Sequence, residues 1–333
     1  MFDKLIETLK ANPRKIVFTE GPDARILEAA SRLKADGFLT PILVGSVDEV
    51  RAAAAKGGFD IEGLEIIDPL TYDKMDEMVD AMVAIRKGKQ TPEECRELLK
   101  KGNYFGTMLV KMGVADSLLG GATYSTADTV RPALQLIKTK PGAHLVSSCF
   151  ILQKEGADLL CMADPAINVS YEDKKDKEGN VVLSAAAQLA EVAVETAKTA
   201  KVFGMDPKVA MLSYSTKGSG KGANVDLVRN ATAIAKEMAP ELDLDGEMQF
   251  DAAVSPVVGQ LKFPGSKVAG YANTFIFPEI QSGNIGYKIA QRLGGYAAYG
   301  PILQGLNAPI NDLSRGCDAE EVYQMSIITA ALA

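Results

Sequence analysis

Short apolar runs alternate with longer amphipathic stretches through the first two-fifths of the chain. The apolar runs at 15–19, 41–45, 64–68 and 115–119 predict strands. Apolar residues at helical spacing lie between them, for example over about 74–86, and the sequence Thr91-Pro92-Glu93-Glu94 is typical of a helix start. Short strands separated by helices predict a mainly parallel sheet flanked by helices on both faces.

The pattern changes near residues 141–142. Two apolar runs, 144–152 and 158–163, are joined by a connection short enough to favour an antiparallel pair. A polar insert at 171–180 predicts an exposed loop or hairpin tip, and further α/β alternation follows it. Because chain termini often lie together, the last thirty or so residues are expected to rejoin the first domain. The sequence thus predicts two α/β domains, which consist of residues 1–143 with about 304–333, and of residues about 144–303.

Charge and cysteine content exclude several classes of protein. The 333 residues include 36 Lys and Arg against 43 Asp and Glu, so the net charge is −7 and binding to nucleic acid is not expected. No apolar run approaches the ~18 residues that span a membrane, and the N-terminus does not resemble a signal peptide. The four cysteines show neither a CxxC pair nor a zinc spacing. Together these features predict a cytoplasmic protein without a metal site.

The histidine content restricts the possible mechanisms. His144 is the only histidine, and it begins an apolar run that predicts a buried strand. We interpret it as structural rather than catalytic. A general base would then have to be a carboxylate, a lysine, a tyrosine or a cysteine.

Two segments offer groups that suit an anion, each with a simpler interpretation. The loop 215–223 fails the Walker A pattern at Ser215 and Gly222, but it matches G-x-G-x-x-A. It is either a flexible glycine turn or a set of amides and two lysines for a phosphate. The segment 125–132 places hydroxyls and Arg131 at a predicted helix start near Thr126. It either binds an anion or caps the helix.

The C-terminal segment 311–322 is the most informative. A small polar turn carries Arg315 and leads directly into a helix, so amides, helix dipole and guanidinium converge where negative charge could develop. Asp318 and Glu321 have capping-box spacing, so Glu321 could instead close the helix start. Cys317 lies at the same helix start, which predicts a thiol more acidic than usual.

These segments together resemble the phosphate acetyltransferase (phosphotransacetylase) family. The resemblance includes the motif Leu313-Ser314-Arg315-Gly316-Cys317 and covers essentially the whole chain. The runs that carry it are 125–135, 207–216, 228–232, 244–253, 298–305 and 313–317.

The resemblance implies a two-domain fold related to isocitrate and isopropylmalate dehydrogenases, with an active-site cleft between the domains. It also implies a homodimer that reversibly converts acetyl-CoA and phosphate to acetyl phosphate and CoA, without a tightly bound cofactor or metal. In the family mechanism the CoA thiolate attacks the acyl phosphate carbonyl directly in a ternary complex.

The resemblance also assigns residues. Arg315 would stabilise the oxyanion, Ser314 would hydrogen-bond the thiol or the intermediate, and Glu321 would be the base, where the family commonly has aspartate. The substrate-binding residues would be Arg292 for phosphate, Arg131 and Arg86 for the phosphates of CoA, and Thr129 and Cys317. Many relatives have cysteine where Pro165 stands, and Cys161 does not replace it.

The chemistry of the substrates agrees with this assignment. Both substrates are polyanions and the protein is acidic, so binding must come from local arginines and helix N-termini. Three other functions stay open: a phosphate butyryltransferase, a non-catalytic acetyl-CoA-sensing homologue, and a nicotinamide-dependent decarboxylating dehydrogenase. The last should show a cluster of metal-binding aspartates that is not evident here, and a sensor would not need Ser314 and Arg315.

Overall fold

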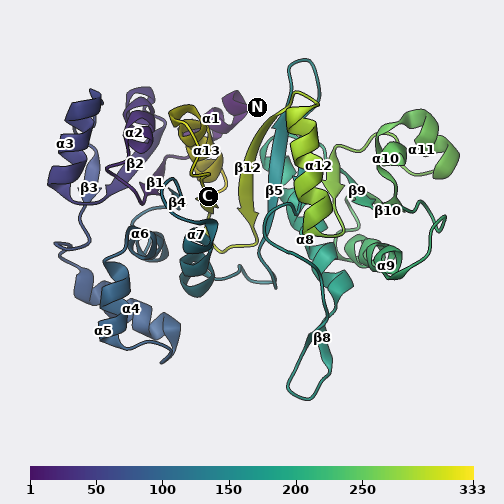
Figure 1. The fold of residues 1–333 in the computed structure, drawn as a ribbon, viewed down its shortest axis with the longest axis horizontal. Coiled ribbons are helices and arrows are strands. Elements are labelled where there is room, and N and C mark those ends of the chain that lie inside the picture. Colours follow the sequence, from purple (N-terminus) through teal and green to yellow (C-terminus); the bar gives the residue numbers. More distant parts are fainter. The chain divides into compact units, whose positions relative to one another are not determined.

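The computed structural model describes residues 1–333, which form two compact units. Unit 1 comprises residues 1–141 and 306–333, and unit 2 comprises residues 142–305. Figure 1 shows the elements of both units. Because the last residues of the chain belong to unit 1, its sheet receives a strand from each end of the sequence.

Unit 1 is built on a five-stranded sheet in the order β13-β4-β1-β2-β3, and every pairing in it is parallel. The strands are β1 (Arg14–Phe18), β2 (Leu39–Val44), β3 (Glu65–Ile67), β4 (Ser117–Gly120) and β13 (Ile310–Asp312). Three consecutive residues of β1, Ile16, Val17 and Phe18, are fully buried. Consecutive buried residues are typical of a parallel strand covered on both faces, so the expected fold class is confirmed.

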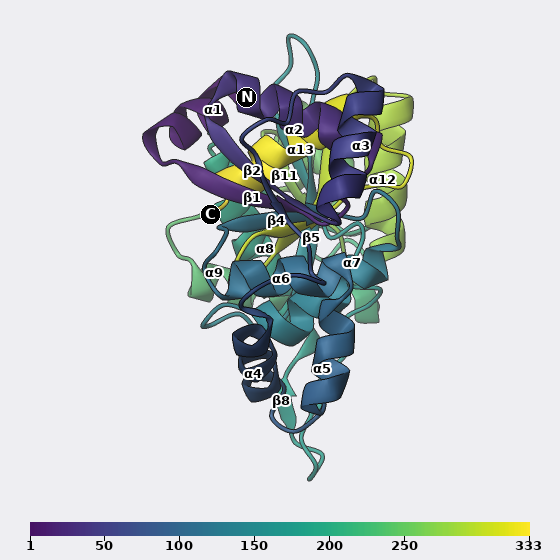
Figure 2. The same cartoon turned by 90° about the vertical axis from the view of Figure 1, so that its left-hand side faces the viewer.

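Helices cover both faces of this sheet (Figure 2). One face carries α1 (Phe2–Ala11), α2 (Ala24–Asp36), α3 (Val47–Gly57) and α13 (Ala319–Ala331). The other carries α4 (Met75–Arg86), α5 (Pro92–Leu99), α6 (Gly102–Lys111), α7 (Thr126–Pro132) and the π-helical turn η1 (Ala133–Ile137). The expected start of α5 is confirmed, because Thr91 and Glu94 form a reciprocal capping box. The expected start of α7 at Thr126 is confirmed as well.

Unit 2 contains a six-stranded sheet in the order β10-β9-β11-β6-β5-β12. Its strands are β5 (Ser147–Gln153), β6 (Leu160–Ala163), β9 (Lys208–Leu212), β10 (Asp243–Met248), β11 (Thr274–Ile276) and β12 (Ala297–Gln304). The predicted antiparallel pair is confirmed as β5 with β6, and β12 also pairs antiparallel with β5. The polar insert forms the exposed hairpin β7 (Lys174–Lys175) and β8 (Val181–Leu183).

The helices of unit 2 are α8 (Ala185–Val202), α9 (Ala223–Met238), α10 (Phe250–Val254), α11 (Pro256–Lys262) and α12 (Ile280–Arg292). Most residues of α8 are buried, so this helix lies inside the unit rather than on its surface. The apolar core on one face of the unit 2 sheet includes Phe150, Met162, Leu212 and Phe275 from the sheet and Phe263 from the residues after α11.

His144 does not lie in a buried strand, so that prediction is wrong. It precedes β5, and its side chain is 62% exposed. Its Nδ1 lies 3.0 Å from Oε2 of Glu191, and its backbone N–H donates to Oε1 of the same carboxylate. The start of this apolar run does not join the sheet, because Glu191 from α8 accepts the backbone N–H groups of His144 and Leu145 that a neighbouring strand would otherwise bind.

Candidate active site

Three neighbouring strands of unit 1, β1, β4 and β13, end at the same edge of the sheet. The residues at these ends are Glu20, two beyond β1, Gly121, one beyond β4, and Asp312, the last of β13. In open α/β sheets, ligands bind outside the carboxyl ends of the strands. The candidate site of unit 1 is therefore expected at this edge of the sheet.

Glu20 ties the ends of β1 and β4 together. Its carboxylate accepts hydrogen bonds from the hydroxyl of Thr19, the N–H of Gly121, and both the N–H and the hydroxyl of Thr123. Burial raises the pKa of Glu20, and these hydrogen bonds oppose the shift. The hydroxyl of Tyr124 lies 2.7 Å from that of Thr19 and extends the same network. The network fixes the loop that leads into α7.

Asp312 holds the start of α7 against the end of β13. Its carboxylate accepts hydrogen bonds from the hydroxyls of Thr126 and Thr129. Burial raises the pKa of Asp312 against the effect of these two donors. Gly121 has a φ of +103°, and a side chain there would collide with Asp312. Thr129, a predicted substrate ligand, is 1% exposed and its hydroxyl is committed to Asp312, so this structure gives it a supporting position.

The predicted Ser314–Cys317 turn directly follows β13, and Arg25 holds it from α2. The turn closes when the N–H of Cys317 donates to the carbonyl of Ser314, at 3.0 Å. One Nη of Arg25 donates to the carbonyls of Arg315 and Cys317, at 2.9 and 3.2 Å, and the other donates to Ala122 O at 2.9 Å. The guanidinium is itself oriented by a bidentate pair with Asp23. The backbone of the turn is thus fixed from a second element.

The side chains of Ser314 and Arg315 are exposed at this fixed turn. The hydroxyl of Ser314 accepts the N–H of Gly316 at 3.2 Å, which leaves its proton available to a ligand. No carboxylate lies within ion-pair distance of the Arg315 guanidinium, so its charge is not neutralised by the protein. A fixed backbone with a free cation suits an anionic group.

Glu321 lies in the first turn of α13, and it does not cap the helix. Asp318 performs that function, because its Oδ1 accepts the N–H of Glu321 at 2.8 Å. The Glu321 carboxylate has no hydrogen-bond partner in the protein, and burial together with the charge of Asp318 raises its pKa. A carboxylate with a raised pKa and no partner can accept a proton from a ligand.

The prediction of an acidic thiol at Cys317 is wrong. Cys317 is 4% exposed, and burial raises its pKa to about 11, a shift that Glu321, Asp23 and Glu20 reinforce and Arg25 opposes. The helix start lowers the pKa of a thiol only if its dipole is left uncompensated and the thiol is solvated. Here the Asp318 carboxylate occupies the helix start.

Arg131 and Arg86, predicted to meet the phosphates of CoA, come from different helices of unit 1 but act on one group. Both charges oppose the raised pKa that burial gives the Tyr104 phenol, so both guanidinium groups lie near it. Arg131 is 58% exposed and lies 3.8 Å from Asp128, while Nε of Arg86 donates to Gln90 at 2.7 Å. The structure therefore brings these two arginines to one region.

Arg292, the predicted phosphate ligand, belongs to unit 2. It is the last residue of α12, it is exposed, and its charge opposes the raised pKa of Tyr287. It forms no ion pair within the chain.

Sequence reasoning missed Glu20 and Arg25. Glu20 could have been found, because it directly follows a buried strand in a parallel sheet, where ligand-binding and positioning residues gather. Arg25 carries no comparable signal, since its contacts lie 290 and 292 residues away in the sequence.

Over nearly its whole length the chain is similar to known phosphate acetyltransferases. Residues 1–330 match the family described as "Phosphate acetyl/butaryl transferase". The phosphate acetyltransferase of Bacillus subtilis is 52% identical over 333 residues, which cover 100% of this chain and 99% of that protein. A phosphotransacetylase structure from Streptococcus pyogenes has a TM-score of 0.94 at 53% identity, covering 99% of this chain and 97% of that one. The EutD phosphotransacetylase of Staphylococcus aureus has a TM-score of 0.87 at 50% identity, with 99% and 98% covered.

None of the helices is both long enough and apolar enough to span a bilayer. Because the family match extends over nearly the whole chain, and because a relative of 52% identity covers all of it, the chain belongs to the phosphate acetyl/butyryl transferase family of acyltransferases.

Proposed function

We propose that this chain transfers an acetyl group reversibly between acetyl-CoA and inorganic phosphate. The observation that carries this proposal is the Ser314–Cys317 turn, which Arg25 fixes through its backbone while Arg315 and Ser314 extend from it to solvent. The relatives that match the whole chain at about half identity are phosphate acetyltransferases, which supports acetyl as the acyl group.

The reaction needs a nucleophilic attack and a proton that moves from the thiol through a base to the leaving phosphate. Glu321 accepts the proton of the CoA thiol, whose pKa near ~8.5 requires only modest assistance at neutral pH. The thiolate attacks the carbonyl carbon of acetyl phosphate, and the carbonyl electrons move to its oxygen, which Arg315 stabilises. When the carbonyl re-forms, the C–O bond to phosphate breaks, and the leaving phosphate takes up the proton that Glu321 holds. Inorganic phosphate and acetyl-CoA then leave, and Glu321 is ionised again. No acyl-enzyme forms in this direct transfer.

The remaining cations bind the polyanionic substrates. Arg131 and Arg86 act on the same phenol, Tyr104, so one polyphosphate group can contact both. We assign them to the phosphates of CoA, as the family resemblance implies. Arg292, which has no carboxylate partner, is assigned to the phosphoryl group of the second substrate. Ser314 donates to the thiol sulfur or to the intermediate.

We further propose that the protein is a cytoplasmic homodimer that associates through unit 2. Tyr214, Phe250 and Ile289 line an apolar cavity of about 470 Å³ and are each about half exposed, and Val257 and Leu293 nearby in α11 and after α12 are at least 80% exposed. Exposed apolar residues on this scale are typical of an interface. Ile289→Asp should shift the mass in solution from dimer to monomer. Leu70→Asp, at an apolar position in unit 1 that is even more exposed (72% against 53%), should not.

The activity is tested with the purified protein, CoA and an acyl phosphate, by following thioester absorbance in the presence of a chelator and without NAD. Acetyl phosphate should react fastest, propionyl phosphate more slowly and butyryl phosphate more slowly still. A preference for butyryl phosphate would assign the chain to the butyryltransferases. Acetyl-CoA binding without any turnover would assign it to the non-catalytic sensors.

A further inference from the structure

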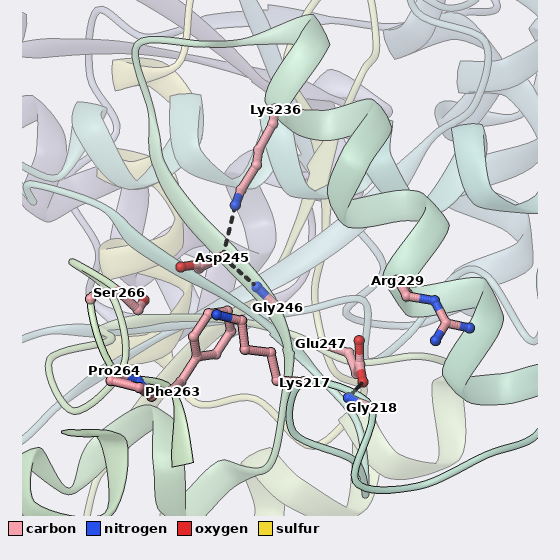
Figure 3. A pocket seen from close by; sticks show the side chains of 11 residues that line it. Lys217, Gly218, Arg229, Lys236, Asp245, Gly246, Glu247, Phe263, Pro264 and Ser266 are labelled. Atoms are coloured by element: carbon pink, nitrogen blue, oxygen red, sulfur yellow. Dashed lines mark hydrogen bonds and ion pairs between the residues drawn. The ribbon is translucent and has the colours of Figure 1, made fainter. Parts of the chain in front are cut away.

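Unit 2 contains a charged pocket that shares no residue with the site proposed for acetyl transfer (Figure 3). Its volume is about 550 Å³, within the range typical of small-molecule sites. Three cations and two carboxylates line it, together with one aromatic ring and a hydroxyl: Lys217, Arg229, Lys236, Asp245, Glu247, Phe263 and Ser266. It adjoins β10, which forms the sheet edge opposite to β12.

The glycine loop that the sequence singled out contributes to this pocket in an unexpected way. Two of its amides are not available to a phosphate. The N–H of Gly218 donates to Oε1 of Glu247 at 2.7 Å, and the N–H of Gly220 donates to Oγ of Ser215. The buried Glu247 carboxylate occupies the place that an anion would take in a phosphate loop. The N–H of Gly218 lines the pocket but is already bonded, so the group that the loop offers to a ligand is the side chain of Lys217 (Figure 3).

Lys217 is held in a conformation that a side chain normally avoids. Its φ is +51°, in the left-handed region that non-glycine residues rarely adopt. Its Nζ lies 4.6 Å from the centroid of the Phe263 ring, and no carboxylate lies within ion-pair distance. The pocket thus contains a cation without an anionic partner.

The other lining groups can accept or donate further bonds. Arg229 and Lys236 are seven residues apart in α9, so they lie on the same face of the helix. Arg229 forms an ion pair with Asp226 in which both side chains are about half exposed, whereas Lys236 pairs with Asp245, whose side chain is mostly buried. Ser266 Oγ accepts two backbone N–H groups, which leaves its proton free to donate. Oδ2 of Asp245 accepts no hydrogen bond from the protein.

We propose that this pocket binds a small phosphate monoester that also carries hydroxyl groups. The phosphate contacts Lys217 and accepts the Ser266 proton, and Arg229 and Lys236 add positive charge. A ligand hydroxyl donates to Oδ2 of Asp245, which explains a carboxylate in a pocket otherwise suited to anions. Phosphate alone would leave Oδ2 of Asp245 without a donor, and an uncharged polyol would leave the charge of Lys217 without an anion.

Glycerol 3-phosphate is a suitable probe, because it combines a phosphate monoester with two hydroxyls. Isothermal titration of the whole protein should show binding of glycerol 3-phosphate. Inorganic phosphate should bind more weakly, and glycerol should give no measurable heat up to about 10 mM, a concentration that would reveal a Kd in the low millimolar range. Lys217→Asn removes the charge and keeps a residue that tolerates the left-handed conformation. It should weaken binding about tenfold or more, as expected for a lost charge-assisted hydrogen bond.

Lys221→Gln is the matched control, since Lys221 is an exposed lysine of the same loop that does not line the pocket. It should leave the affinity unchanged. Arg229→Gln provides a second disruption that does not involve the strained loop residue. The proposal is overturned if glycerol 3-phosphate does not bind, if it binds Lys217→Asn and Arg229→Gln as tightly as the natural chain, or if Arg292→Gln alone abolishes binding. The thioester assay on the same samples reports acetyl transfer separately.

Discussion

The guanidinium of Arg25 donates to the backbone carbonyl of Arg315 at 2.9 Å, although 290 residues separate them in the sequence. Arg25 thus fixes the backbone that carries the proposed oxyanion ligand, while it leaves the Arg315 side chain free. The same guanidinium reaches the carbonyls of Cys317 and Ala122 and pairs with Asp23. One side chain from α2 therefore joins the loops after β4 and β13.

This arrangement makes Arg25 a positioning residue. Arg25→Gln should lower kcat by about tenfold or more, because small displacements of a catalytic group are costly. KM for CoA should change less, since Arg131 and Arg86 do not depend on this contact. Arg25→Lys should recover little, because a lysine cannot keep the bidentate pair with Asp23 and the carbonyl bonds together. Steady-state kinetics and thermal unfolding check this, and unchanged kcat with lowered stability would leave Arg25 a purely structural role.

Glu321 should act through its ionised form. Glu321→Gln should lower kcat by ~10²–10⁴-fold, as is typical for the loss of a general base. Because burial raises the pKa of Glu321, the acid limb of kcat/KM should lie at higher pH than the ~4.3 of an ordinary glutamate, and the variant should lose this limb. Glu321→Asp should keep more activity. A stable Glu321→Gln enzyme with normal turnover would transfer the role to Glu320 or Asp312, but Glu320 pairs with Arg32 and Asp312 with two threonines.

The effect of Glu321 on stability distinguishes a base from a helix cap. Its pKa is higher in the folded chain than in the unfolded chain, so the folded state binds the proton more tightly. Its contribution to the free energy of unfolding therefore falls as the pH rises from ~4.3 through the raised pKa. At pH 7, Glu321→Gln should leave the stability equal or slightly higher. A loss of about 1 kcal/mol in chemical denaturation would instead indicate a capping role.

Cys317 should be an unreactive thiol. With a pKa of about 11, it is almost entirely protonated at neutral pH, and only the thiolate is alkylated readily. Iodoacetamide should modify it more slowly than a free cysteine at pH 7.5, and the rate should rise with pH up to about 10. Cys317→Ala should keep most of the activity, because direct transfer forms no acyl-cysteine. A folded but inactive Cys317→Ala enzyme would contradict that mechanism.

Local features of the fold could be read from the sequence, because they depend on neighbours in the chain. The strand predicted at 15–19 is β1 (Arg14–Phe18), and Thr91 caps α5 with the expected box. Features that depend on distant segments could not. Burial reversed the expected pKa shift of Cys317, and Glu191 of α8 took the amides that were expected to make His144 part of a strand. Glu247, from β10, likewise accepts the N–H of Gly218, one of the loop amides that a phosphate could have used.

The two arginines assigned to different substrates should respond differently to the same substitution. The oxyanion forms where a carbonyl oxygen lay, so the facing group needs a charge held in a fixed direction. Arg315 meets this need, because its backbone is fixed by Arg25 and its guanidinium has no carboxylate partner. Losing one such donor costs roughly 10²–10³-fold in kcat. The kcat of the Arg315→Gln enzyme should fall by at least that much while its fold stays intact. Arg315→Lys should recover only part of the lost kcat.

Arg131→Gln should instead raise KM for CoA with a smaller change in kcat. Arg131 is 58% exposed, and a contact to a phosphate of CoA stabilises the ground state and the transition state alike. Steady-state kinetics on Arg315→Gln, Arg315→Lys and Arg131→Gln, with both substrates varied, separate the two effects. The roles would have to be exchanged if Arg315→Gln changed only KM while Arg131→Gln abolished turnover, because a residue that contacts only a remote phosphate cannot selectively stabilise the intermediate.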